Sequence, residues 1–300
     1  MEEPLVHVII LNTNRRHDTL ACLESLFAGL YANFKVIVLD NQSTDGSVDA
    51  IRSAFPAVEL VHLKSNHGYA GNNNIGVELA LFQASDWVFV LNEDTILDRD
   101  CLMRLIEVGE SDPRIGIVGP MVYHHDEPHV IQSAGGVLGR FWQSQHLCQN
   151  EEDRGQFRDP HQVEWISGCA ILVRRAVIEQ VGALDAGFFI YWEETEWCIR
   201  AGSAGWRIVH VPAARLWHKG VQRDYQPKPA FMYYSTRNHL FTLAKHKAPF
   251  RAWLYTSVQL IRTLASWTIK PRWRFKREHR NAMWGGILDF LQHRAGPMPS

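Results

Sequence analysis

The chain has 300 residues, 46% of them hydrophobic and 21% charged, which allows one large folded domain with an appendage and excludes extensive disorder. The net charge of −1 hides a division along the chain. Residues 237–300 hold twelve Lys/Arg and two Asp/Glu, a balance of +10, whereas residues 1–236 hold nineteen basic and thirty acidic residues, a balance of −11. A basic C-terminal segment on an acidic body predicts contact with an anionic surface, either a membrane or nucleic acid.

Strand and helix patterns alternate through the first 120 residues. Short apolar runs predict strands, and apolar residues at helical spacing predict helices. The expected strands are 6–11, 35–39, 58–63, 87–91 and 115–118, and the expected helices are 18–27, 47–55, 70–82 and 100–108. Fully apolar strands in this order predict an α/β fold, with a mostly parallel central sheet flanked by helices on both faces.

The remainder of the chain is less regular. We expect loops and short antiparallel strands over 121–165, then a strand at 167–174, a helix at 193–201 and a last strand at 207–211. Residues 250–269 and 282–291 have the spacing of amphipathic helices, and the segment between them, KPRWRFKREHR, is basic with aromatic residues interleaved. Such helices suit the lipid interface, although simple packing against the domain is the alternative.

The cysteines and the N-terminus indicate the compartment. The five cysteines are scattered and contain no C-x-x-C pair, which is typical of reduced thiols. The first residues, MEEPLVHVIIL, lack the basic and long apolar regions of a signal peptide. We therefore expect a cytoplasmic protein.

Two polar clusters follow predicted strands, at the sheet edge where α/β folds bind ligands. In DNQSTDG, Asp40 could accept hydrogen bonds from a base or a ribose, or could simply form a turn before the next helix. In SNHGYAGNNNIG, glycines allow close approach of a phosphate-bearing ligand and asparagines supply amides, a structural helix start being the alternative. This cluster is neither a Rossmann nor a P-loop motif.

Two acidic clusters come later. LNEDT (91–95) ends a strand, and hard oxygen ligands there could hold a Mg²⁺- or Mn²⁺-bound diphosphate, with Asn92 and Asp94 on the same side. FFIYWEETEWCIR (188–200) places three carboxylates among aromatic residues, which would raise a carboxylate pKa and favour a general base. A solvated helix start is the alternative.

The order of these blocks resembles the inverting family 2 glycosyltransferases, and especially their bacterial rhamnosyltransferase and galactofuranosyltransferase-like branch. The resembling blocks also include VHVIILNTN, SGCAILVRR and LWHKG, and they run from about Val6 to Asn238. The resemblance implies a GT-A fold and transfer of a sugar from a nucleoside diphosphate to a glycan or glycolipid hydroxyl. It favours dTDP-rhamnose as the donor, with UDP-linked sugars second.

The resemblance also implies roles for single residues. Glu194 would be the catalytic base, and Asp94 and His218 would bind Mg²⁺ or Mn²⁺. Asn92 takes the place of the first Asp of the family's D-x-D motif, and Glu194 replaces the commoner Asp. The donor-binding residues would be Asn12, Asp40, Asn66, Gly68, Asn73 and Asn92.

The expected organisation is a GT-A domain over 1–240 and a basic, amphipathic, membrane-associating tail over 241–300. Residues 1–120 would bind the nucleotide, and residues 121–240 would supply the acceptor and catalytic half. The expected location is peripheral, at the inner face of the cell membrane, without a nucleic-acid partner. Two alternatives are a nucleotidyltransferase, for which Arg15 and Arg16 are the only candidate triphosphate ligands, and a non-catalytic membrane-binding module.

Overall fold

The computed structural model describes residues 3–220 and 226–299. Its main feature is a ten-stranded sheet with the order β10-β12-β6-β11-β4-β1-β2-β3, to which β5 and β7 add at β12 and β6. The strands are β1 (Val6–Asn12), β2 (Phe34–Asp40), β3 (Glu59–His62), β4 (Trp87–Asn92), β5 (Thr95–Leu97), β6 (Ile115–His124), β7 (Ile131–Ser133), β10 (His161–Gln162), β11 (Ala170–Arg174) and β12 (Arg207–His218). A separate ribbon pairs β8 (Gly136–Leu138) with β9 (Ser144–His146).

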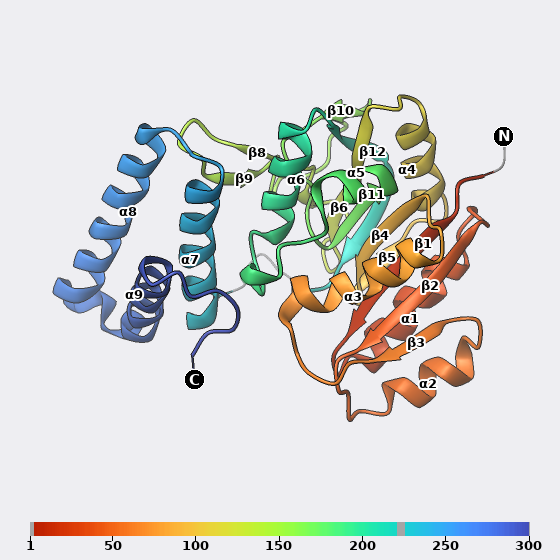
Figure 1. The fold of residues 1–300 in the computed structure, drawn as a ribbon, viewed down its shortest axis with the longest axis horizontal. Coiled ribbons are helices and arrows are strands. Elements are labelled where there is room, and N and C mark those ends of the chain that lie inside the picture. Colours follow the sequence, from red (N-terminus) through yellow and green to blue (C-terminus); the bar gives the residue numbers. More distant parts are fainter. Residues whose placement is uncertain (1–2, 221–225, 300) are drawn as a thin grey trace.

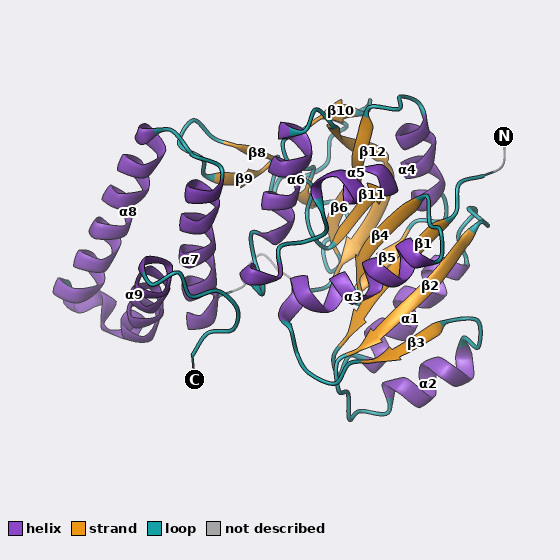
Figure 2. Ribbon diagram, viewed as in Figure 1, coloured by secondary structure: helices purple, strands orange, loops and turns teal. Residues whose placement is uncertain are grey.

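Helices cover both faces of the sheet, as Figure 2 shows. The helices of this body are α1 (Arg16–Phe27), α2 (Ser47–Ala54), α3 (Gly68–Phe82), α4 (Cys101–Glu110), α5 (Arg175–Val181) and α6 (Glu193–Ser203), with a short 3-10 helix η1 (Ala186–Phe188). One apolar core lies under α1, α2 and α4, and a second lies under α3, α5 and α6. Strands β3, β2, β1 and β4 are mutually parallel, so the predicted α/β fold with a mostly parallel sheet is confirmed.

Strands β6 and β12 are longer than expected. Strand β12 runs from Arg207 to His218 rather than stopping at residue 211, because the chain resumes pairing after a register shift between Val211 and Arg215. Its last residues pair with β5, and His218 is the register partner of Thr95. The extension therefore carries His218 to the end of the LNEDT segment.

The C-terminal part is a group of helices at one end of the sheet (Figure 1). It comprises α7 (Pro229–Lys245), α8 (Phe250–Ile269), the 3-10 helix η2 (Pro271–Lys276) and α9 (Arg277–Leu291). The expected domain boundary at residue 240 falls inside α7, which the sequence pattern did not reveal. Helices α7 and α9 approach closely at Gly286, where an added Cβ would lie 2.5 Å from the Tyr233 carbonyl oxygen.

Two further facts concern the cysteines and the helices. All five cysteines lie in the described part of the chain and are unpaired thiols. Within residues 3–220 and 226–299, no helix combines the length and the apolar character needed to cross a bilayer.

Candidate active site

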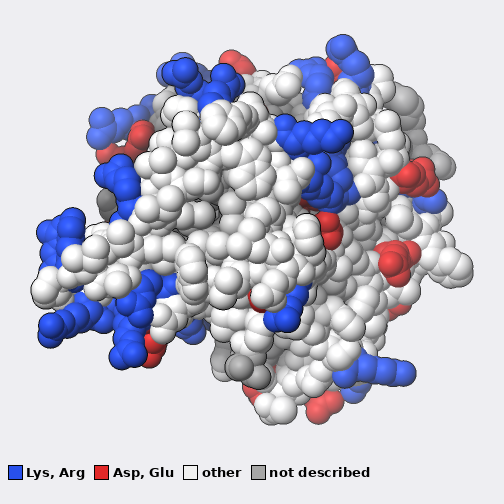
Figure 3. Space-filling view, turned by 60° about the vertical axis from the view of Figure 1, so that its left-hand side comes forward, with Lys and Arg blue, Asp and Glu red and all other residues white. Residues whose placement is uncertain are grey.

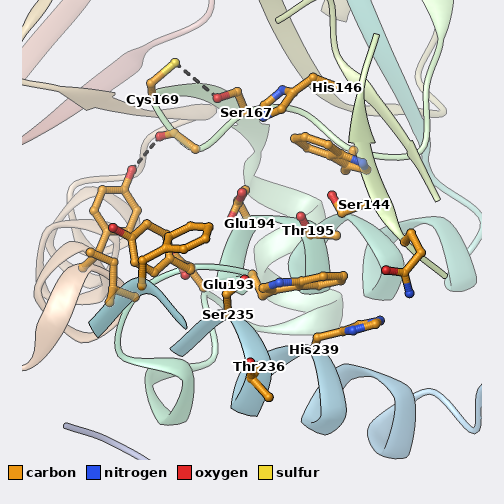
Figure 4. A pocket seen from close by; sticks show the side chains of 18 of the residues that line it. Ser144, His146, Ser167, Cys169, Glu193, Glu194, Thr195, Ser235, Thr236 and His239 are labelled. Carbon is orange, nitrogen blue, oxygen red and sulfur yellow. Dashed lines mark hydrogen bonds between the residues drawn. The ribbon is translucent and has the colours of Figure 1, made fainter. Parts of the chain in front are cut away.

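A cavity of about 640 Å³ lies between the carboxyl edge of the sheet and the C-terminal helices. Three of the predicted site residues line it: Asn92, Glu194 and His218. The opposite wall comes from α7 and α8, including Thr236, His239 and Thr256 of those helices. Figure 4 shows Glu193 and Glu194 at the start of α6, with Thr236 and His239 from α7 across from them.

Glu194 presents a carboxylate on the cavity wall. Its side chain packs over Gly168, where an added Cβ would lie 3.5 Å from Glu194 Cβ and Cγ. Within the described chain, no Lys, Arg or His forms an ion pair with it. Burial raises the pKa of Glu194, because a carboxylate is poorly solvated there. A base with a raised pKa removes a hydroxyl proton more effectively than an ordinary surface carboxylate.

The other two carboxylates of this block have different environments. Glu193 is 4% exposed, its Oε2 has no hydrogen-bond partner, and burial and the neighbouring Glu194 raise its pKa well above the usual range. Glu196 receives hydrogen bonds from Arg200 at 2.8 and 2.9 Å and lies 3.0 Å from His246 Nε2. Burial alone would raise the pKa of Glu196, but these partners lower it. Glu193 and Glu194 both line the cavity without an ion pair in the described chain, but Glu194 is the more exposed of the two, since Glu193 is buried.

The loop before α6 is held by α7. Phe189, Tyr191 and Trp192 have φ values of 67°, 68° and 75°, a left-handed conformation that is strained for residues with side chains. The amide of Asn238 donates to the carbonyls of Phe188, Ile190 and Tyr191 at 2.8–2.9 Å. Asn238 is fully buried, so these bonds are not exchanged for water. It thereby fixes the loop that aims Glu194, a role with no signal in the sequence pattern.

His218 and Asn92, which line the cavity, form a second cluster with Asp94. His218 Nε2 lies 3.1 Å from Asp94 Oδ1 and 3.4 Å from Asn92 Nδ2. His218 Nδ1 lies 2.7 Å from Gln132 Oε1, an acceptor, which places the imidazole proton on Nδ1. Nε2 then carries a lone pair toward Asp94, the arrangement of a metal-ligating histidine oriented by a neighbouring carbonyl.

The same cluster fits a divalent cation. Although Asp94 Oδ1 is close to Nε2, it has no partner with hydrogen-bond geometry, and the residue is 6% exposed. Burial raises the pKa of Asp94, but the contacts with His218 and the charge of Arg15 lower it on balance. Gly220 leaves open the space above both groups, since an added Cβ would lie 2.6 Å from Asp94 Oδ2 and 3.0 Å from Nε2. Asp94 and His218 are only two such side chains, and nowhere in the described chain do three or more His, Cys, Asp or Glu side chains converge on a metal position.

The predicted nucleotide residues lie at the same sheet edge, outside the cavity lining. Asn12 and Asp40 are register partners at the ends of β1 and β2, and Asn12 Nδ2 donates to Asp40 Oδ1 at 3.0 Å. Asn12 is fully buried and also bonds to the hydroxyls of Thr19, Ser43 and Ser47. Every polar atom of the Asn12 side chain is thus bonded within the protein, and its place in the wall of the nucleotide pocket stays a prediction.

Asn66, Gly68 and Asn73 form the start of α3. Asn66 is exposed, and its Oδ1 accepts from the Gly68 amide at 2.9 Å. Gly68 has φ 76° and contacts Phe189 so closely that no side chain could replace its hydrogen. Asn73 is buried, donates to the Tyr69 carbonyl, and keeps its Oδ1 without a partner. This segment thus touches the loop that carries Glu194.

Aromatic and histidine residues that the sequence did not assign complete the cavity. Trp192 stacks on His239 with ring centroids 4.5 Å apart, and Trp165 meets His146 edge-on at 4.6 Å. Burial lowers the pKa of both histidines to about 4. They are therefore neutral near pH 7. Flat apolar faces of this kind suit sugar rings.

Comparison with known proteins places this fold among the sugar transferases. The model of the family described as Glycosyl transferase family 2 matches residues 7–182, more than half of the chain. The N-acetylglucosaminyl-diphospho-decaprenol L-rhamnosyltransferase of Mycobacterium tuberculosis is 28% identical over 249 residues, which cover 77% of this chain and 81% of that protein. The rhamnosyltransferase WbbL of Escherichia coli is 26% identical over 224 residues, which cover 71% and 83%. The mannosyltransferase PcManGT from Pyrobaculum calidifontis, solved with GDP-Man and Mn²⁺, superposes with a TM-score of 0.63 at 17% identity, covering 98% of this chain and 89% of that one.

The chain belongs to glycosyl transferase family 2 and has the GT-A fold. It is a glycosyltransferase, as the resemblance of its motifs predicted. The nucleotidyltransferase and non-catalytic alternatives raised by the sequence therefore do not apply.

Proposed function

We propose that this glycosyltransferase inverts the anomeric centre of a nucleoside-diphosphate sugar as it transfers the sugar to a hydroxyl of a lipid-linked or polysaccharide acceptor. The observation that carries the proposal is the position of Glu194. It is a carboxylate with a raised pKa on the cavity wall, which it shares with His218 and Asn92. A base and a pyrophosphate site in one cavity are the two elements that a single displacement requires.

In the proposed reaction, the Glu194 carboxylate accepts the proton of the acceptor hydroxyl. The acceptor oxygen attacks the anomeric carbon, and the bond from that carbon to the diphosphate oxygen breaks. The nucleoside diphosphate leaves with the electron pair, so one displacement inverts the centre. Glu193, whose pKa lies well above the usual range, stays protonated and leaves Glu194 as the single negative charge of the pair.

Asp94 and His218 are the proposed ligands of Mg²⁺ or Mn²⁺, with Asn92 beside them. When bound, such an ion would neutralise charge developing on the departing diphosphate. The lone pair of His218 Nε2 and the unpartnered Asp94 Oδ1 support this assignment. Asp40, Asn66, Gly68 and Asn73 lie along the same sheet edge, where the nucleoside and sugar would extend.

The two named relatives are rhamnosyltransferases, and this supports dTDP-rhamnose as the first donor to test, with UDP-linked sugars second. The first of them acts on a diphospho-decaprenol by its name, which supports a lipid-linked acceptor here.

The base is tested with Glu194→Gln, and Glu193→Gln is the matched control. Transfer should fall by about 10²- to 10⁴-fold in Glu194→Gln, while the rise in melting temperature caused by the donor is kept. Glu193→Gln should keep most of its activity, because Gln resembles the protonated acid. Equal losses of transfer activity in the two variants would refute the assignment of Glu194 as the base. NMR of the product would show whether the anomeric configuration is inverted.

We further propose a peripheral site of action at the cytoplasmic face of the membrane. The outer face of α8 carries Leu254, Val258, Ile261 and Ile269, which are 53%, 42%, 66% and 76% exposed. Basic residues of α8, η2 and α9 surround these apolar side chains, and Figure 3 shows Lys and Arg gathered on this side of the molecule. An exposed apolar stripe with cations beside it suits an anionic lipid interface.

Vesicle co-sedimentation tests this proposal. Ile261→Glu with Ile269→Glu should abolish binding to phosphatidylglycerol vesicles, whereas exposed Phe82→Glu on the body should not. Undiminished binding of the α8 variant would show that this face is not the lipid contact.

A further inference from the structure

Helix α8 has a polar stripe on its inner side. Thr256, Gln259, Thr263 and Ser266 follow each other at intervals of three and four residues, so they share one face. Thr256, Gln259 and Thr263 line the catalytic cavity opposite α6 and α7. The first turn of α8 packs Ala252 and Trp253 into an apolar cluster. From Thr256 onward the polar stripe faces the cavity while exposed apolar residues lie on the outer face, the reverse of an ordinary surface helix.

The stripe continues into a second hollow. This hollow, of about 520 Å³, lies between the end of α8 and η2 and shares Gln259 and Thr263 with the catalytic cavity. Three cations line it: Arg262, Lys270 and Arg272. Arg262 lies six residues beyond Thr256, about 9 Å along the helix axis, and Lys270 lies about 21 Å beyond it.

The three cations have no acidic counterpart in the described chain. No Asp or Glu of residues 3–220 and 226–299 forms an ion pair with Arg262, Lys270 or Arg272, and the hollow contains no carboxylate. Trp267 and Trp273 also line it, and Arg272 lies over the Trp273 ring at 5.3 Å. Arg272 beside its aromatic ring, together with Arg262 and Lys270, supplies the positive charge and the guanidinium donors that phosphate groups bind.

We propose that this hollow binds the diphosphate of a lipid-linked acceptor, whose sugar then enters the catalytic cavity along the polar stripe of α8. The inference rests on the proposed function, which provides for the diphosphate of the donor at Asp94 and His218. A second cationic hollow that adjoins the same cavity therefore fits the second substrate. The apolar chain of the acceptor would leave the hollow beside Ile269, which is 76% exposed.

The test measures binding of farnesyl diphosphate to the full chain by tryptophan fluorescence, with a chelator present so that no cation holds the ligand at Asp94. The site variant is Arg262→Gln/Lys270→Gln/Arg272→Gln. The matched control is Arg274→Gln/Lys276→Gln/Arg277→Gln, which removes the same charge from residues that do not line the hollow. We expect at least tenfold weaker binding in the site variant, less than threefold in the control, and weak binding of farnesol to all forms.

Equal losses in the two triple variants, or equal affinities for farnesol and farnesyl diphosphate, would overturn the proposal. So would a site variant that loses binding to phosphatidylglycerol vesicles yet keeps farnesyl diphosphate binding, since the hollow would then hold phospholipid headgroups. Stabilisation by the donor sugar nucleotide is measured on the same preparations. Its absence from the unmodified chain would count against the proposed function alone, because the diphosphate measurement does not depend on the donor.

Discussion

Replacing Gly220 by Ala gives the sharpest test of the cation site. The added Cβ would lie 2.6 Å from Asp94 Oδ2 and 3.0 Å from His218 Nε2. Ordinary van der Waals contact begins at 3.4 Å, so the oxygen must move by about 0.8 Å. Metal–ligand distances tolerate shifts of only about 0.2 Å. We therefore expect the Mn²⁺ affinity to fall by about 10- to 100-fold, the size of effect seen when groups that orient ligands are disturbed.

The assay is calorimetric titration of Mn²⁺, with nucleoside diphosphate present, followed by the metal dependence of transfer. Gly139→Ala is the control, because a Cβ there would meet its nearest neighbour at 3.6 Å, an ordinary contact. If Gly220→Ala binds Mn²⁺ as tightly as the unmodified chain, the ion does not sit against Asp94 and His218.

Two further predictions follow from buried groups. Asn238→Ala should lower kcat by about tenfold or more, because the loop before Glu194 loses three hydrogen bonds. The rise in melting temperature caused by the donor should persist. An unchanged kcat would show that the loop keeps its conformation without Asn238. His210 is fully buried, both ring nitrogens lack partners, and burial, with a smaller contribution from His161, lowers its pKa to about 3. The imidazole of His210 therefore binds a proton more readily in the unfolded chain than in the folded one. The free energy of unfolding is highest above pH 6.5 and decreases as the pH falls toward 3, by about 2 kcal/mol at pH 5. His210→Phe should flatten the urea-unfolding free energy between pH 7 and 5, whereas exposed His129→Phe should not; a slope retained in His210→Phe would contradict this.

The parallel part of the fold was predictable because its signals are local. Apolar runs such as Val36–Leu39 and Val88–Leu91 are fully buried on both sides, and polar residues stop each strand at one edge. The family motifs then named Glu194, Asp94 and His218 as site residues. The contact between Asp94 and His218 could not be predicted from hydrophobic periodicity. It forms because β12 resumes its pairing after Pro212 and reaches β5.

The rest of the cavity was missed for a different reason. Gln132 in strand β7, Trp165 between β10 and β11, and Asn238 in helix α7 act through hydrogen bonds to residues far away in the chain. One polar side chain at one position leaves no periodic trace. The reversed polarity of α8 was also hidden, since an amphipathic pattern gives the two faces of a helix without saying which of them the protein covers.

The reversed polarity of α8 gives one helix two roles. Its twenty residues would line the path of the acceptor on one side and contact lipid on the other. Adsorption on that face would orient the cavity toward molecules confined to the plane of the membrane, so that the enzyme would search a surface rather than a volume. A substitution on the outer side of α8 could then reduce turnover of a lipid-anchored acceptor through its surface density, while the chemistry at Glu194 and the use of a water-borne acceptor stay the same.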